Sequence, residues 1–343
     1  MPSGLVRVSR RKVQLTGGSS LIVSIPKEWA EEMGIGKGSE VTLIDQAGKG
    51  ILLVPNSFSP PKREAVIEVS KEDSVEGVMR ELISLYLSGY TTIGLRGKDG
   101  RIEREKRARL KELVRRMLVG VEVMSDVPDY MVLHVFTILP ELSVMNVLKR
   151  MAILATSMHK EAMEALRSGN LEQAEGVIKA DDDVDRFALY VTKMLNGAMR
   201  NDVMLEDIGV ESPSDCLGLR VVVKSVERIA DHASKLARLL LDYRIRLSPK
   251  AVDKLSKFGE DALGVFADAM RSLFTGDPEL ANRTVERARR LGEAEEEVLA
   301  SIDEREKIHA KLVSEHLRRV AEYASDIAEI VHNMTFHKTV KQP

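Results

Sequence analysis

Two pairs of carboxylates spaced four residues apart are the feature of this sequence with the clearest chemistry. Asp181 and Asp185 form one pair, and Glu227 and Asp231 form the other. Side chains four positions apart lie on one helix face, so each pair stacks two negative charges that repel by about a few tenths of a kcal/mol. Oxygen ligands from facing helices can bind a divalent or trivalent cation, which reverses the sign of that cost.

An alternative interpretation needs no metal. The acids can form a solvated helix face that is balanced by Lys179, Arg186 and Lys224. Spacing alone leaves both interpretations open, and it leaves the ion open among Fe, Mn, Zn, Ni and Mg.

The helices that carry these acids belong to an internal repeat. The segment that starts at Ala162 matches the one at Ala269, an offset of 107, and the segment at Arg228 matches the one at Arg319, an offset of 91. The first copy therefore has 16 extra residues, which we expect in the turn around 202–215. The two copies span 140–246 and 247–338, each with three helices.

The second copy lacks most of the acids. The four positions of the first pairs fall on Ala288, Gly292, Arg318 and Glu322. Glu322 with Asp326 is a weaker candidate pair, and Glu293 with Glu297 requires a slipped helix. We therefore predict one metal site per chain.

Residues 1–56 form a different kind of unit. Gly17-Gly18 separates two β-type runs, at 12–15 and 21–24, Pro26 opens a helix that ends at Gly34, and two more strands follow, at 41–44 and 51–54. A chain of about 45 residues cannot bury a sufficient core alone, so we expect an obligate homodimer. Residues 1–27 carry five cations and no acid, namely Arg7, Arg10, Arg11, Lys12 and Lys27. This pattern favours contact with duplex DNA, and the alternative is a strand that is kept soluble by its charge.

The segment between these units begins with a proline-containing linker at 57–63. Alternating strands and helices predict a small α/β unit at 64–138. Its helix at 102–118 is basic, but the interspersed Glu103, Glu105 and Glu112 favour a solvated face over a DNA contact.

The whole-chain composition excludes several classes of protein. With 343 residues, 30% of them charged and a net charge of −2, the chain is typical of a soluble multidomain protein. Cys216 is the only cysteine, which excludes an intrachain disulfide, and no apolar run is long enough to insert into a membrane. We expect a cytoplasmic protein, and without a nucleotide-binding loop or nucleophile motif we expect no enzyme.

Residues 10–54 resemble the swapped-hairpin domain of the AbrB/MazE/SpoVT family of DNA-binding proteins. The resemblance rests on the basic strand, the glycine turn, Ile25-Pro26 and the GIGKGSEV turn at 34–41. It implies that Arg10, Arg11 and Lys12 contact double-stranded DNA, with Arg7 as a weaker addition.

Residues 140–338 are similar to the PhoU family of phosphate-signalling proteins. The similarity rests on DDDVD at 181–185 and ERIADHA at 227–233, because the tandem three-helix bundles of that family hold metal ions in E/D-x-x-x-D motifs. Joined to an AbrB-like head, the chain resembles an archaeal branch of phosphate uptake regulators. This implies a transcriptional regulator with a metal-binding sensor region.

Two competing functions remain open. One is an adaptor that acts on a phosphate transporter or a sensor kinase, with the head used only for dimerisation. The other is a carboxylate-bridged metal enzyme, for which Glu306 and His309 supply only one of the two E-x-x-H motifs required.

Overall fold

The computed structural model of the protein describes residues 7–45, 50–55, 62–136, 142–200 and 205–335. The chain divides into two compact units, residues 1–61 and 62–343. This boundary falls within the predicted linker at 57–63, most of which lies outside the described residues.

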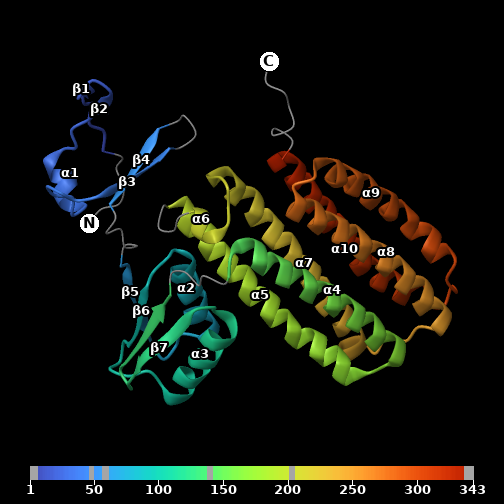
Figure 1. Ribbon diagram of the computed structural model, residues 1–343. Coiled ribbons are helices and arrows are strands. Elements are labelled where there is room, and N and C mark those ends of the chain that lie inside the picture. The colour runs from blue at the N-terminus through green and yellow to red at the C-terminus, as the bar shows by residue number, and fades with distance from the viewer. Residues whose placement is uncertain (1–6, 46–49, 56–61, 137–141, 201–204, 336–343) are drawn as a thin grey trace. The chain divides into compact units, whose positions relative to one another are not determined.

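The first unit consists of two antiparallel hairpins and a short helix (Figure 1). Strands β1 (Gln14–Thr16) and β2 (Ser20–Ile22) pair across the turn at Gly17 and Gly18, whose φ angles are 60° and 82°. Helix α1 (Lys27–Glu32) follows Pro26, and strands β3 (Val41–Asp45) and β4 (Ile51–Pro55) pair after it. The element order agrees with the sequence analysis, but we expected the first strand to begin at Lys12, and pairing begins only at Gln14.

Apolar side chains of this unit remain open to solvent. None of its described side chains is buried, and Leu21, Leu43 and Ile51 are 70%, 62% and 70% exposed. So many large apolar groups in one small unit require a covering partner, because their burial is the main favourable term in folding.

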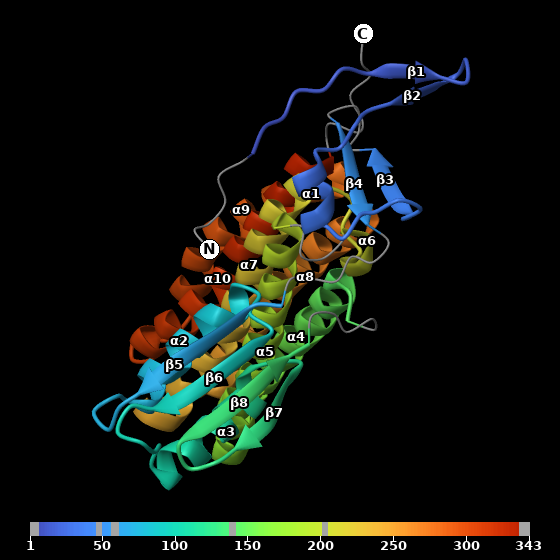
Figure 2. The same ribbon diagram turned by 90° about the vertical axis from the view of Figure 1, so that its left-hand side faces the viewer.

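The second unit begins with an α/β segment that contains four strands and two helices. In chain order these are β5 (Glu64–Val69), α2 (Val75–Leu87), β6 (Thr92–Gly97), α3 (Arg104–Met117), β7 (Val121–Asp126) and β8 (Tyr130–Val135). The strand order is β5-β6-β8-β7, as Figure 2 shows, with β5 and β6 parallel and the other pairs antiparallel. One sheet face packs on α2 and α3, where Leu95, Leu133, Leu82 and Leu110 are buried.

Six long helices follow and form the repeated bundle. They are α4 (Val144–Ser168), α5 (Leu171–Met199), α7 (Pro213–Tyr243), α8 (Pro249–Thr275), α9 (Pro278–Ala300) and α10 (Lys307–Thr335), and the short α6 (Leu205–Ile208) precedes α7. Helices α4, α5 and α7 pack together, as do α8, α9 and α10, and α7 joins the two groups by packing on α10. One hydrophobic core runs through both groups.

The repeat is visible in the helix ends. Gly169 ends α4 and Gly276 ends α8 in the left-handed conformation, with φ angles of 70° and 64°. The next residues, Asn170 and Asp277, cap α5 and α9 by accepting backbone N–H bonds.

The extra residues of the first copy lie only partly where we expected them. The turn around 202–215 is longer than its counterpart, but α5 also has 29 residues where α9 has 23. Part of the surplus therefore lengthens α5, because helix periodicity continues through the apolar run at 187–198.

The added length of α5 contacts the α/β segment. The Asn196 side chain donates to the Leu87 carbonyl at 3.2 Å, and the Lys193 ammonium lies 5.1 Å from the centre of the Tyr86 ring. Lys193 also donates to the Phe136 carbonyl, and burial lowers its pKa to about 8. None of the described helices is long and apolar enough to span a membrane.

The exposed apolar groups of the first unit predict a dimer in solution. The wild-type chain should show about twice its mass of 38.2 kDa in light scattering after size exclusion. The double variant Leu21→Asp, Leu43→Asp should shift towards the monomer, because charge at the covering surface opposes burial. Leu217→Asp, at a 66% exposed position on α7, is the control and should remain dimeric. A dimer that survives both head substitutions contradicts this assignment.

Candidate metal centre and nucleic-acid interface

Three of the four predicted metal ligands meet between α5 and α7. Asp185, Glu227 and Asp231 each offer a carboxylate oxygen, and these three atoms lie within 4.8 Å of one another. Each of the three residues is half-buried. Ca²⁺ and Mg²⁺ bind oxygen at about 2.0–2.6 Å, so one cation placed among these atoms can reach all of them.

Asp181 lies one helical turn before Asp185 and faces the same cluster. Its Oδ1 is buried and has no hydrogen-bond partner in the structure. Burial, together with the charges of Asp231 and Glu227, raises the pKa of Asp181 to about 6. Burial and the neighbouring carboxylates, of which Asp181 has the largest effect, raise the pKa of Asp185 to about 7. Both carboxyl groups therefore ionise at a higher pH than a free aspartate, and a bound cation would favour their ionised form.

The cluster has little cationic compensation from the protein. Lys224 pairs with Glu227 at 2.6 Å, but the Lys224 side chain is half exposed to solvent. Asp182, in the same acidic run, instead pairs with Arg116 of α3 at 3.5 Å, and Asp183 is exposed. The four acidic residues of the run at 181–185 thus have different environments, which the sequence did not separate.

The residues present fit a hard cation. The ligand atoms are carboxylate oxygens, as such cations require, and the half-buried Asp181 carboxylate has no cationic partner among the described residues, although a hydrogen bond from Ser234 lowers its pKa. Ser234 is a further residue of this site that the sequence analysis missed. It is buried beside Asp181, and its only signal in the sequence is the spacing of three residues from Asp231.

The second repeat has an arginine where the first has Glu227. Arg318 Nε lies 3.0 Å from Glu295, a buried acid of α9 that also binds Lys311 at 3.0 Å and accepts a hydrogen bond from Ser314. This network pairs the acidic charge with protein cations.

The weaker candidates of the second repeat have their own partners. Glu322 pairs with Arg318 and, at 2.7 Å, with Arg319. Burial raises the pKa of Asp326 while nearby Arg228 lowers it. Neither residue belongs to a group of three potential ligands among the described residues.

Histidines lie in the core rather than at the acidic cluster. His232 of α7 meets His316 of α10, with the two Nδ1 atoms 3.0 Å apart. His159 of α4 is fully buried, and its Nε2 donates to the Ile229 carbonyl at 2.7 Å. Burial lowers the pKa of His159 to about 4 and that of His232 to about 3. The His159 and His232 rings are therefore neutral at physiological pH.

The isolated E-x-x-H motif has a structural role. Glu306 accepts hydrogen bonds from the backbone N–H and, at 2.8 Å, from the hydroxyl of Ser248, the residue that caps α8. His309 is exposed.

The predicted DNA contacts fall into two groups. Arg10, Arg11 and Lys12 are exposed in the segment before β1, and no ion pair links them to another described residue. Arg7 instead pairs with Glu32 and lies 5.4 Å from the centre of the Trp29 ring. Its hydrogen bond lowers the pKa of the Glu32 carboxyl group. Arg7 therefore links the segment before β1 to α1 through an exposed ion pair.

Several cations of the basic helix α3 form ion pairs with acidic side chains. Arg107 pairs with Asp126 at 3.0 Å, Lys111 also pairs with Asp126, and Arg109 pairs with Glu112 at 2.8 Å. These pairs agree with the interpretation of α3 as a solvated, ion-paired helix.

Family models match both parts of the chain. The PhoU domain matches residues 148–240 and again residues 255–331. The antidote-toxin recognition domain MazE, described as a bacterial antitoxin, matches residues 14–60. The chain belongs to the PhoU family, and it joins two PhoU domains to an N-terminal MazE-like domain. The archaeal branch of the resemblance remains a prediction.

Two solved structures are similar to this chain at low identity. PhoU from Pseudomonas aeruginosa is 20% identical with a TM-score of 0.46, covering 57% of this chain and 96% of that chain. The phosphate transport system regulatory protein PhoU from Streptococcus pneumoniae is 16% identical with a TM-score of 0.47, covering 58% and 96%. No curated protein matches the chain.

The acidic cluster predicts a metal-dependent gain in stability. After treatment with a chelator, adding Mn²⁺ at about 100 times its Kd should stabilise the wild type by about 2.7 kcal/mol, seen as a higher midpoint of thermal unfolding. The variant Asp185→Asn, Glu227→Gln should lose this response and should be more stable without metal, because two repelling charges are gone. Asp183→Asn, which removes one exposed charge from the same run, should respond as the wild type does. Equal responses in all three proteins exclude the site.

We predict that burial of His159 lowers the free energy of unfolding in acid. Its pKa is about 4 in the folded protein and about 6.5 in the unfolded chain, so the unfolded state binds more protons between these values. Stability is therefore full above pH 6.5 and falls as the pH drops towards 4. His159→Gln keeps an N–H donor for the Ile229 carbonyl but has no charge to gain. The decrease in unfolding free energy from pH 7 to pH 5, measured in urea, should be about 2 kcal/mol smaller than in the wild type. Exposed His309→Gln is the control, and an equal decrease in both variants contradicts the prediction.

Proposed function

We propose that the chain is a cytoplasmic, DNA-binding transcriptional regulator of phosphate uptake or phosphate homeostasis, whose PhoU region is a metal-binding sensor. The main support for DNA binding is the run of exposed cations at Arg10, Arg11 and Lys12. This run directly precedes the hairpin that the MazE family model matches. Together with the absence of any acid before Glu28, this run provides a surface for phosphate groups.

A dimer doubles this surface. Two copies of the segment related by a two-fold axis fit a palindromic or quasi-palindromic operator, because the symmetry of the protein then matches that of the DNA. Phosphate contacts set position and affinity, while sequence preference requires base contacts from the same loops.

The sensor part rests on the acidic cluster of the first repeat. A cation bound by Asp185, Glu227 and Asp231 would link α5 to α7, with Asp181 available as a fourth ligand. Helix α5 also holds the α/β segment through Asp182, Lys193 and Asn196. A metal can change DNA binding only if it binds one conformation of the chain more tightly than another. Helix α5 would couple the metal site to the α/β segment, because it contacts both.

The proposal predicts DNA affinity that depends on salt and on three cations. The wild-type chain should bind a fluorescein-labelled duplex of about 30 bp, measured by anisotropy, with an affinity that falls as salt rises. The variant Arg10→Ala, Arg11→Ala, Lys12→Ala removes six cations from a dimer. Each phosphate contact contributes about 0.9 to the slope of log K against log salt, so the slope should decrease by up to about 5.

A matched triple variant removes cations from the α/β segment. Lys98→Ala, Arg104→Ala, Arg115→Ala has the same change in charge at exposed positions, and it should bind DNA as the wild type does. If the wild type does not bind duplex DNA at low salt, the regulator proposal fails. The adaptor that contacts a phosphate transporter or sensor kinase then becomes the leading function, with the head used for dimerisation.

A further inference from the structure

The first helices of the two repeats leave a groove between them. Helices α4 and α8 run in opposite directions, since Arg167 near the end of α4 bonds Asp253 near the start of α8 at 2.5 Å. Towards the start of α4 the helices are separated by a groove with a volume of about 570 Å³. Neither the acidic cluster nor the N-terminal cations contribute to it.

The groove is lined by one stripe of side chains from each helix. The stripe of α4 repeats at helical spacing through Lys149, Ile153, Thr156 and Lys160. The stripe of α8 repeats every four residues through Phe266, Met270 and Phe274. Such spacing is that of a helix face that packs against another helix. The stripe from Lys149 to Lys160 is about 17 Å long, or three helical turns.

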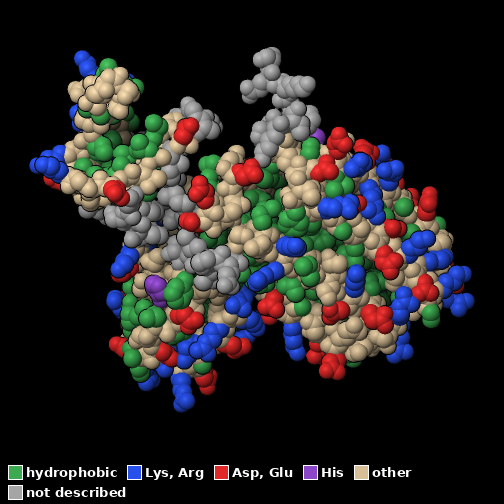
Figure 3. Space-filling model, viewed as in Figure 1, with side chains coloured by type: hydrophobic (Ala, Val, Ile, Leu, Met, Phe, Trp, Pro, Cys, Tyr) green, Lys and Arg blue, Asp and Glu red, His purple; other side chains and the backbone are tan. Residues whose placement is uncertain are grey.

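The floor of the groove is apolar and open to solvent. Ile153 is 61% exposed and Phe274 is 39% exposed. Figure 3 shows hydrophobic side chains on this face of the bundle, while Lys, Arg, Asp and Glu cover much of the surface around them.

Cations border the groove on both sides. Lys149 and Lys160 extend from α4 and Arg271 from α8, and among the described lining residues there is no Asp or Glu. Arg271 pairs with Asp268 at 2.7 Å, so it is the least available of the three. The local charge is positive in a chain whose net charge is −2.

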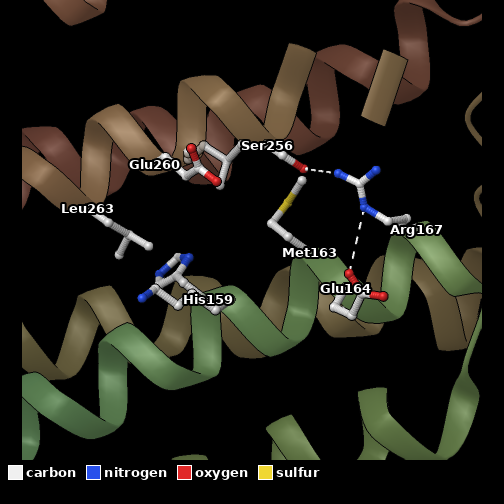
Figure 4. A pocket seen from close by; sticks show the side chains of 10 residues that line it. His159, Met163, Glu164, Arg167, Ser256, Glu260 and Leu263 are labelled. Carbon is white, nitrogen blue, oxygen red and sulfur yellow. Dashed lines mark hydrogen bonds and ion pairs between the residues drawn. The ribbon is translucent and has the colours of Figure 1, made fainter. Parts of the chain in front are cut away.

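Near the end of α4 and the start of α8, polar and charged side chains lie between the two helices. There a cavity of about 160 Å³ contains both signs of charge, and Arg167 bonds Ser256 at 3.2 Å across it and pairs with Glu164 at 3.6 Å (Figure 4). Glu260 of α8 also lines this cavity. These contacts join α4 to α8, so the open groove ends near Lys160.

We propose that this groove binds an acidic amphipathic helix of a partner protein. The apolar stripe of α8, together with Ile153 of α4, accepts the apolar face of a third helix, and the bordering cations select carboxylates beside that face. A nucleic acid would leave the apolar floor without a partner, and a lipid bilayer is too flat to enter a groove. The proposal goes beyond DNA binding and metal sensing and rests on neither.

A designed peptide tests the proposal on the full-length chain. The probe is a fluorescein-labelled helical peptide of about 14 residues with leucine at positions i, i+3, i+4 and i+7 and glutamate beside them. The comparison peptide has lysine in place of each glutamate. Anisotropy should show that the acidic peptide binds, that added salt weakens it, and that the basic peptide binds at least tenfold more weakly.

Variants locate the binding to the groove. Ile153→Glu and Lys149→Glu lie at exposed positions and should keep the circular dichroism and thermal midpoint of the wild type. Each should reduce the affinity for the acidic peptide at least tenfold. Ile308→Glu, at a 77% exposed position on α10, is the matched control and should bind as the wild type does.

Three results overturn the proposal. The first is equal binding of both peptides, and the second is undiminished binding to Ile153→Glu. The third is a mass of the Ile153→Glu variant below that of the wild type in light scattering. Such a result would mean that the groove is an interface between copies of this chain.

Discussion

Helix α5 packs against α7 through one face and against the α/β segment through another, and this constraint fixes the rotation of the helix. One side carries Asp181 and Asp185 towards α7, and the other holds the α/β segment through Asp182 and Lys193. Interiors are close-packed, so a rotation of α5 that relieves the acidic cluster also disturbs the contacts with the α/β segment. The repelling carboxylates are therefore held together by packing energy that comes from the surrounding core.

The two repeats differ in how their buried acidic side chains are neutralised. In the second repeat Arg318 and Lys311 neutralise Glu295, and the buried acid has ionic partners within the protein. In the first repeat the corresponding face has Glu227 in place of the arginine, and no cation among the described residues pairs with Asp181. Because a buried charge must be paired or neutralised, the first repeat depends on a proton or a cation where the second does not.

The first unit depends on a different constraint, the ratio of surface to volume. Its two hairpins pair regularly and its helix is short, but no described side chain is buried within one copy. Backbone hydrogen bonds alone contribute little net stability, so the unit requires apolar burial from outside itself. The cations before β1 are available for contact, because no described residue of the unit forms an ion pair with them.

The sequence by itself determined the order and type of the elements, since helical periodicity, the paired glycines and the caps at Asn170 and Asp277 are local signals. It also placed Asp181 beside Asp185 and Glu227 beside Asp231, because spacing within one helix fixes which side chains share a face. Only the tertiary structure decided which faces meet. Three contacts join residues more than 20 positions apart in the sequence. They are the pairs Asp182–Arg116, His232–His316 and Arg7–Glu32. Such contacts depend on how helices and strands pack, and no local pattern contains that information.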